Sequence, residues 1–199
     1  TSVPKIVQDY LNRIAAIDSD GHKCIRIYNG YGAGHFVKMV HNGIEYAEMQ
    51  LISEIYDLLR KRRNNDTYIA EIFEKLSKSA QGSYLFDITK NIINKEVEGK
   101  PILNRISTVA GHKGTGKWAI EAGIELGVAI PSISASFDSR VISQNTLTSD
   151  QKVTEEAVDI NFDDLYKAIY QLRVSIFMQG LNLIKKGSSK NAEKIKFFF

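Results

Sequence analysis

The longest periodic run of apolar residues lies within residues 35–63. Its members recur every three or four positions with no proline between them: Val37, Val40, Ile44, Ala47, Leu51, Ile55 and Leu58. An α-helix has about 3.6 residues per turn, so this spacing places all of them on one side of a helix. The pattern predicts one long amphipathic helix that turns this side toward a core.

Shorter runs with the same period predict further helices on both sides of the long one. We expect them over residues 4–17, from Ile69 to Leu76, and over 83–95, 117–126 and 132–143, the last opened by Pro131 directly before it. A final long helix is predicted to begin after Asn161, whose side chain can cap it, and to stop at Gly187. The polar residues 144–159 predict a surface loop. The expected fold class is mainly α, a multi-helix domain over residues 31–199.

Residues 1–30 differ from the rest because they combine a helix with one short strand. Ile25 and Ile27 alternate with polar neighbours over residues 23–28, which is the period of a strand. One strand forms no sheet, so we interpret residues 1–30 as the trailing αβ unit of an α/β domain otherwise missing from the chain. The apolar end, Phe197 to Phe199, leads us to expect a truncation there as well.

Composition excludes several classes of protein. The 199 residues are 43% hydrophobic and 25% charged, as in globular proteins, and the net charge of +3 favours no nucleic-acid partner. No apolar run reaches the length of a membrane span. The single cysteine, Cys24, excludes an internal disulfide framework, and four histidines without metal-ligand spacing predict no metal site. We expect a cytoplasmic protein.

The first of two glycine-rich segments, Gly30 to His35, lies between the predicted strand and the long helix. It resembles a dinucleotide-binding fingerprint, but His35 takes the place of a small residue and the following region is helical. A simpler interpretation is that the glycines let the chain turn tightly into the helix.

The second glycine-rich segment, Gly111 to Lys117, satisfies the pattern G-x-x-x-x-G-K after residues 106–110, which can form a strand. Trp118, however, stands where a nucleotide triphosphatase needs a hydroxyl to hold magnesium. The glycine amides, with Lys113, Thr115 and Lys117, can still bind a phosphate group. The segment therefore favours a phosphorylated ligand.

A polar stripe on the long helix consists of Lys38, His41, Asn42 and Glu45, which fall within an arc of about 100°. It can be a solvated face. Yet it continues into Met49, Ile52 and Tyr56, which are apolar, so we expect the helix to be enclosed and the stripe to line a cavity. Lys38 and Glu45 lie two turns apart, about 10 Å, so they can act as separate base and acid on one small substrate.

Two segments, residues 32–46 and 111–118, have the sequences GAGHFVKMVHNGIEY and GHKGTGKW. They closely resemble the signature segments of the 6-phosphogluconate dehydrogenase (decarboxylating) family, within a similarity that covers about residues 23–187 and is faint over 64–103. The resemblance implies an NADP-binding Rossmann domain, a helical domain of the β-hydroxyacid dehydrogenase type, and a tail that enters the partner subunit of a homodimer. This chain would hold the end of the coenzyme domain and the first half of the helical substrate and dimerisation domain.

The resemblance also implies an activity and residue roles. The activity is NADP-dependent oxidative decarboxylation of 6-phosphogluconate to ribulose 5-phosphate and carbon dioxide, in the pentose phosphate pathway and without a metal. Lys38 would be the base and then the cation that stabilises the enolate, and Glu45 the acid that protonates C1 of the enediol. His41 and Asn42 would bind the substrate's hydroxyls and carboxylate. Its phosphate would be held by Tyr46, Lys113, Thr115 and Arg140.

Some positions depart from the family pattern or have a simpler explanation. Ala135 and Asp138 stand where some members have Glu and Phe, His112 replaces the usual Gln, and Ala47 the usual Gly. Arg140 can be a surface cation and Tyr46 a packing residue. A phosphate-loop nucleotide-binding protein and a noncatalytic helical interaction module stay open as alternatives. Without a complete dinucleotide-binding unit, the chain alone is predicted to be inactive.

Overall fold

The computed structural model describes residues 3–18, 20–28, 30–62, 65–111, 114–145 and 161–189. Their elements are α1 (Lys5–Ile14), α2 (Ala33–Lys61), α3 (Asp66–Ser77), α4 (Tyr84–Ile93), β1 (Glu96–Val97), β2 (Lys100–Pro101), the 3-10 helix η1 (Ile102–Arg105), α5 (Thr115–Leu126), α6 (Pro131–Asn145) and α7 (Phe162–Ser189). The prediction of a mainly α, multi-helix domain is confirmed. No helix in the described ranges is long and apolar enough to cross a membrane.

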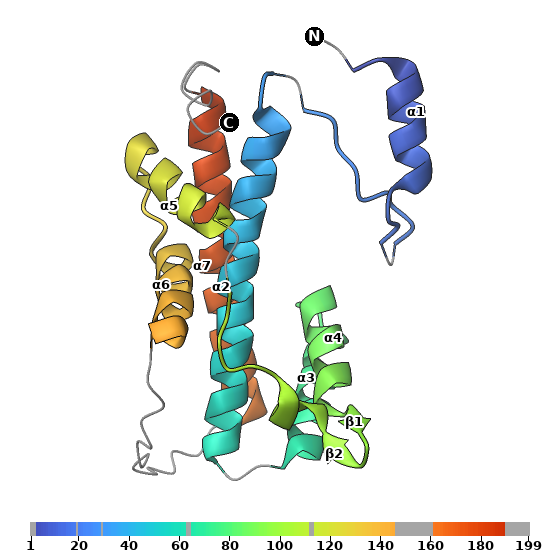
Figure 1. The fold of residues 1–199 in the computed structure, drawn as a ribbon, viewed down its shortest axis with the longest axis vertical. Helices are drawn as coiled ribbons and strands as arrows, with labels where there is room; N and C mark the ends of the chain where they lie inside the picture. Colours follow the sequence, from blue (N-terminus) through green and yellow to red (C-terminus); the bar gives the residue numbers. More distant parts are fainter. Residues whose placement is uncertain are drawn as a thin grey trace.

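Helices α2 and α7 run side by side along the long axis of the domain (Figure 1). Helices α5 and α6 pack on α2 from one side, and the α3–α4 pair lies near its C-terminal end. The buried core includes residues of all these helices, among them Val40 and Ile44 of α2, Phe73 of α3, Ile133 of α6 and Leu183 of α7. The face of α2 that the apolar period predicts therefore faces the core.

Close packing of α2 on its neighbours depends on glycines. A Cβ on Gly180 of α7 would overlap the side chain of Ile44, and one on Gly187 would lie 2.5 Å from Cε1 of Phe36. The prediction that α7 stops at Gly187 is wrong, because the helix continues to Ser189. Gly187 is a point of close helix contact, not a C-terminal cap.

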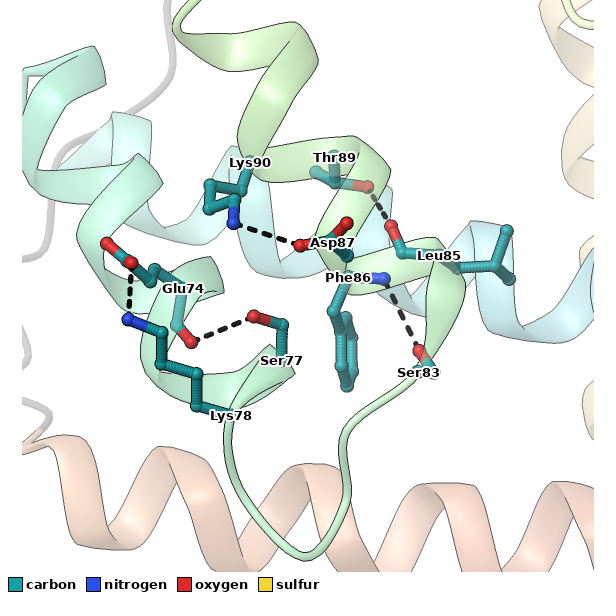
Figure 2. Close-up of polar contacts among 9 residues, drawn as sticks. All are labelled: Glu74, Ser77, Lys78, Ser83, Leu85, Phe86, Asp87, Thr89 and Lys90. Atoms are coloured by element: carbon teal, nitrogen blue, oxygen red, sulfur yellow. Dashed lines mark hydrogen bonds and ion pairs between the residues drawn. The ribbon is translucent and has the colours of Figure 1, made fainter. Parts of the chain in front are cut away.

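Two helix starts, at Pro131 and after Asn161, agree with those expected from the sequence. The amide of Asp164 donates to Oδ1 of Asn161 over 2.8 Å at the start of α7, and α6 begins at Pro131. In the α3–α4 pair, shown in Figure 2, Ser83 caps α4 by accepting from the amide of Phe86. The ring of Phe86 turns away from these polar contacts and lies 6.1 Å from the ring of Phe73.

The predicted strand over residues 23–28 is wrong, and the possible strand over residues 106–110 does not form. Residues 23–28 form only an isolated bridge, between Ile17 and Lys23, and α1 buries none of its residues. Apolar and polar residues do alternate over residues 23–28, but no neighbouring strand among the described residues forms backbone hydrogen bonds with them as in a sheet. Residues 106–110 are irregular after η1.

The two strands that the structure does contain, β1 and β2, form a hairpin. It turns at Glu98 and Gly99, both of which have positive φ. The loop predicted over 144–159 lies almost wholly outside the described residues.

A buried ion pair joins α2 to α7. Glu48 is only 5% exposed, and Nε of Arg173 donates to its two carboxylate oxygens over 2.9 and 3.1 Å. Nη1 of Arg173 also donates to the carbonyl of Gln81, in the turn between α3 and α4. The guanidinium lies 5.1 Å from the ring centroid of Phe86. One side chain of α7 thereby holds both α2 and the α3–α4 pair.

Burial raises the pKa of Glu48 above its ordinary value of 4.5, and the charge and hydrogen bonds of Arg173 act in the opposite direction. A carboxyl whose folded-state pKa is raised stabilises the fold fully below its unfolded value. It loses that contribution as the pH rises through the folded value. The ion pair limits this loss.

We expect Arg173→Met to lower the free energy of unfolding by about 3–5 kcal/mol at neutral pH, because Glu48 would be left buried and unpaired. The deficit should shrink as the pH falls, because burial raises the pKa of Glu48 and its carboxyl takes up a proton before the pH reaches the ordinary value of 4.5. The control is Arg60→Met, which breaks the exposed pair with Asp66 and should cost less than about 1 kcal/mol. Urea unfolding of the full-length gene product at several pH values measures the loss of unfolding free energy in both variants. A loss in Arg173→Met that does not depend on pH would contradict the role of an unpaired Glu48.

Gly180→Ala should lower the free energy of unfolding by about 1–3 kcal/mol, because its Cβ overlaps Ile44 in a packed interface. Gly34→Ala is the matched control, since a Cβ there meets nothing within 4 Å. It should be neutral or add about 0.5 kcal/mol. Equal effects of the two changes in thermal unfolding would show that helix packing does not require the glycine.

Candidate active site

The polar stripe on α2 forms a short chain of side chains. Nζ of Lys38 lies 3.3 Å from Nδ1 of His41. Nδ1 of His41 lies 4.0 Å from Oε2 of Glu45. An ammonium has only donors, so the Lys38 contact favours the imidazole tautomer with its proton on Nε2. His41 thus stands between the candidate base and the candidate acid.

The expectation that this stripe lines an enclosed cavity is wrong for the described residues. Lys38 and His41 are exposed and Asn42 and Glu45 half-buried, with 60% of the His41 side chain open to solvent. Neighbouring helices pack on other sides of α2. The apolar continuation of the stripe also has a structural reason, because the hydroxyl of Tyr56 donates to Asp66 at the start of α3 over 3.2 Å.

A cavity of about 190 Å³ does lie against α2, between it and α6 and α7. Its lining includes Ala47 and Leu51 of α2, Ser136 of α6 and Ile176 of α7. At 100° per residue, these α2 positions lie roughly opposite the polar stripe. The cavity is therefore separate from the candidate acid and base.

The second glycine-rich segment leads into the N-terminus of α5. Gly114 has a φ of 92° and precedes the helix, and Thr115 is its first residue and half-buried. The first amides of a helix have no partner within it, which suits an anion. Lys117 is exposed and pairs with Glu121 over 3.4 Å. Lys113 lies outside the described residues, as does His112. The absence of a strand over residues 106–110 argues against a nucleotide-binding phosphate loop.

Arg140 of α6 is not a free surface cation. Its guanidinium lies 3.8 Å from the ring centroid of Tyr46 on α2, and its Nη1 donates to the carbonyl of Gly111 over 2.8 Å. The ring of Tyr46 in turn packs on α5, where a Cβ on Gly116 would lie 2.8 Å from Cε2 of the ring. Tyr46 and Arg140 therefore bring together the two segments that resemble family signatures.

Two residues that the sequence interpretation missed also hold the loop before α5. Oγ of Ser143 accepts from the amide of Ala110 over 3.1 Å, and Nε2 of Gln144 donates to the carbonyl of Ala110 over 2.9 Å. Ser143 and Gln144 lie one helical turn after Arg140, on the same face of α6. That spacing is the only signal in the sequence, and it does not reveal the partner.

Within the described ranges, no three His, Cys, Asp or Glu side chains lie close enough together to hold a metal ion. The groups that the fold does assemble are an amine, an imidazole and a carboxylate on α2, beside a guanidinium and a helix N-terminus. Such a set can move protons on a ligand and hold its anionic end. With these groups a helical domain can contribute one face of an acid–base, anion-binding site.

The chain belongs to the 6-phosphogluconate dehydrogenase family, because residues 34–197 match that family's C-terminal domain. It is 37% identical over 198 residues to the decarboxylating 6-phosphogluconate dehydrogenase of Lactococcus lactis subsp. cremoris, covering 93% of this chain and 42% of the relative. A chloroplastic enzyme of the same name from Arabidopsis thaliana is 38% identical over 208 residues, with coverages of 94% and 42%.

A solved structure of Plasmodium falciparum 6-phosphogluconate dehydrogenase has the same fold. It superposes with a TM-score of 0.81 at 32% identity, over 92% of this chain and 42% of that one. That enzyme has been solved in its apo form and in complex with its cofactor NADP+ and its substrate 6-phosphogluconate. This chain thus spans about two fifths of the length of the relatives it matches.

Proposed function

We propose that this chain supplies the helical, substrate-binding part of an enzyme that oxidises and decarboxylates 6-phosphogluconate to ribulose 5-phosphate with NADP⁺. The observation that carries the proposal is the contact of Tyr46 with Gly116 and Arg140. Tyr46 directly follows the polar stripe on α2, so this contact brings the stripe close to the second glycine-rich segment. Family membership and the relatives' names support the same reaction.

In this proposal Lys38 is the base that takes the proton of the substrate's 3-hydroxyl. The resulting ammonium then polarises the 3-carbonyl and stabilises the enolate that forms when carbon dioxide leaves. Glu45 protonates C1 of the enediol. The distances of 3.3 and 4.0 Å through His41 support an arrangement in which base and acid address different atoms of one substrate.

The remaining candidate residues bind the substrate. His41 and Asn42 contact its hydroxyls and carboxylate, and Tyr46, Lys113, Thr115 and Arg140 hold its phosphate. Arg140 and the N-terminus of α5 support this role, because a guanidinium and free helix amides both favour a phosphate dianion.

NADP does not fit the residues described in this chain. Gly30 and Gly32 have positive φ and lead into α2, and the described residues around them form no strand–turn–helix unit. The coenzyme, which supplies the hydride acceptor, would be held by a domain outside residues 31–199. We propose that residues 1–30 are the trailing part of that domain.

We also propose that the enzyme is a homodimer. Large apolar side chains are exposed on one face of α7, at Tyr170, Val174, Phe177 and Leu181, which are three or four residues apart, and at Met178 beside them. A contiguous apolar stripe of this kind favours a protein partner, here a second copy. The single, exposed Cys24 supports a reducing compartment, which we propose to be the cytoplasm.

The full-length gene product should reduce NADP⁺ in the presence of 6-phosphogluconate and release ribulose 5-phosphate, whereas residues 1–199 alone should not. Absorbance at the NADPH band and assay of the ketose measure the two products. Magnesium-dependent ATP hydrolysis without NADPH formation would replace this proposal with the nucleotide-binding alternative.

Substitutions of Lys38 and of Glu45 should impair different steps of the reaction. Lys38→Met should abolish both oxidation and decarboxylation, and Lys38→Arg should not restore them, because guanidinium keeps the charge but gives up no proton near neutral pH. Glu45→Gln should slow protonation of the enediol by about 10²–10⁴-fold while oxidation persists. Proton exchange at C1 of ribulose 5-phosphate in the reverse direction measures this step, and exchange at the wild-type rate would refute the role of Glu45.

A further inference from the structure

The cavity between α2, α6 and α7 has a volume of about 190 Å³. An apolar cavity of about 150 Å³ holds benzene, so this one can take a ligand of about five to seven non-hydrogen atoms. Part of its lining is aliphatic and consists of Ala47 and Leu51 of α2, Ala135 of α6, and Leu172 and Ile176 of α7. This wall suits a short hydrocarbon chain.

Two of the three serine hydroxyls that line the cavity already donate to backbone carbonyls of α6. Oγ of Ser136, a residue only 1% exposed, donates to the carbonyl of Ile133 over 2.7 Å. Oγ of Ser139 donates to the carbonyl of Ala135 over 2.9 Å. A hydroxyl has one proton and two lone pairs, so these two oxygens offer a ligand acceptors and no donor.

The charge in the lining is negative. Among the described residues that line the cavity, Glu54 carries a charge and none is Lys, Arg or His. Nε2 of Gln50 donates to Oε1 of Glu54 over 2.9 Å, which orients the carboxylate and uses one of its roughly four acceptor positions. The charge of Glu54 repels an anionic ligand and attracts a cationic one.

We propose that this cavity binds a small aliphatic amine in its ammonium form. The alkyl chain lies on the aliphatic wall, and the ammonium donates to Glu54 and to the serine oxygens. An ammonium has three donors and no acceptor, which complements a lining rich in acceptors. None of the residues that line the cavity belongs to the candidate acid–base or phosphate-binding residues, so the proposal does not rest on the proposed function.

The probe is n-butylammonium, with 1-butanol and butyrate as a neutral and an anionic molecule of similar size. Methyl NMR of the full-length gene product reports binding at Leu51 and Ile176, and the methyl groups of Ile93 on α4 serve as a reference outside the cavity. Butylammonium should shift the Leu51 and Ile176 signals saturably with a Kd of about 1–10 mM and leave Ile93 unchanged. Butanol should bind at least about twofold more weakly, and butyrate should not bind.

The contribution of the charge is tested with Glu54→Gln. This change should weaken butylammonium about two- to fivefold, as expected for an exposed ion pair, and leave the affinity for butanol unchanged. Glu125→Gln on α5 is the matched control, because it removes the same charge outside the cavity lining and should change neither affinity.

The location is tested with Ala135→Leu. Ala135 is exposed and lines the cavity, so a larger side chain there should fill the cavity and abolish binding. The midpoint of urea unfolding should stay close to that of wild type, which separates a filled cavity from a misfolded protein. Equal affinities for butylammonium and butanol, or an unchanged affinity in Glu54→Gln, would overturn the proposal. Binding that persists in Ala135→Leu, or no shift of Leu51 and Ile176 in the wild type, would do so as well.

Discussion

The ion pair of Glu48 and Arg173, in which one guanidinium nitrogen donates to both carboxylate oxygens, is the contact on which the arrangement of this domain depends. It is buried, so its two charges stabilise the fold only while both are present, and either one alone would carry a large desolvation cost. Through the carbonyl of Gln81 the same guanidinium fixes the turn between α3 and α4. The central helix is thereby fixed against α7 close to Glu45.

Different sides of helix α2 have different roles: some pack on neighbouring helices, and one carries the polar stripe. Gly43 admits α5 and α6, since a Cβ there would meet Ala119 and Ile133 at 3.2 and 3.1 Å, and Ile44 packs against Gly180 of α7. The polar stripe occupies the side that these neighbours leave open. The packed sides hold the helix rigid, so the exposed amine, imidazole and carboxylate keep their spacing although few contacts restrain them directly.

Helix positions were predictable because the periodic apolar residues and the caps are local features. Asn161 and Pro131 act as predicted, and the long helix begins within two residues of the expected start. The errors concern residues whose role depends on a distant partner. Glycine commonly ends a helix, but Gly187 instead allows α7 to pack closely on Phe36. Residues 23–28 alternate as a strand does, but they have no neighbouring strand among the described residues.

The sequence by itself determined the α class, the helix that carries Lys38, His41, Asn42 and Glu45, and the two segments typical of the family. It determined these because helix periodicity and short motifs need only neighbouring residues. The tertiary structure alone decided that Tyr46 stacks on Arg140, that Glu48 pairs with Arg173, and that no other described element covers the polar stripe. These contacts join residues as far as 125 positions apart, and no local pattern encodes which distant side chain will be the partner.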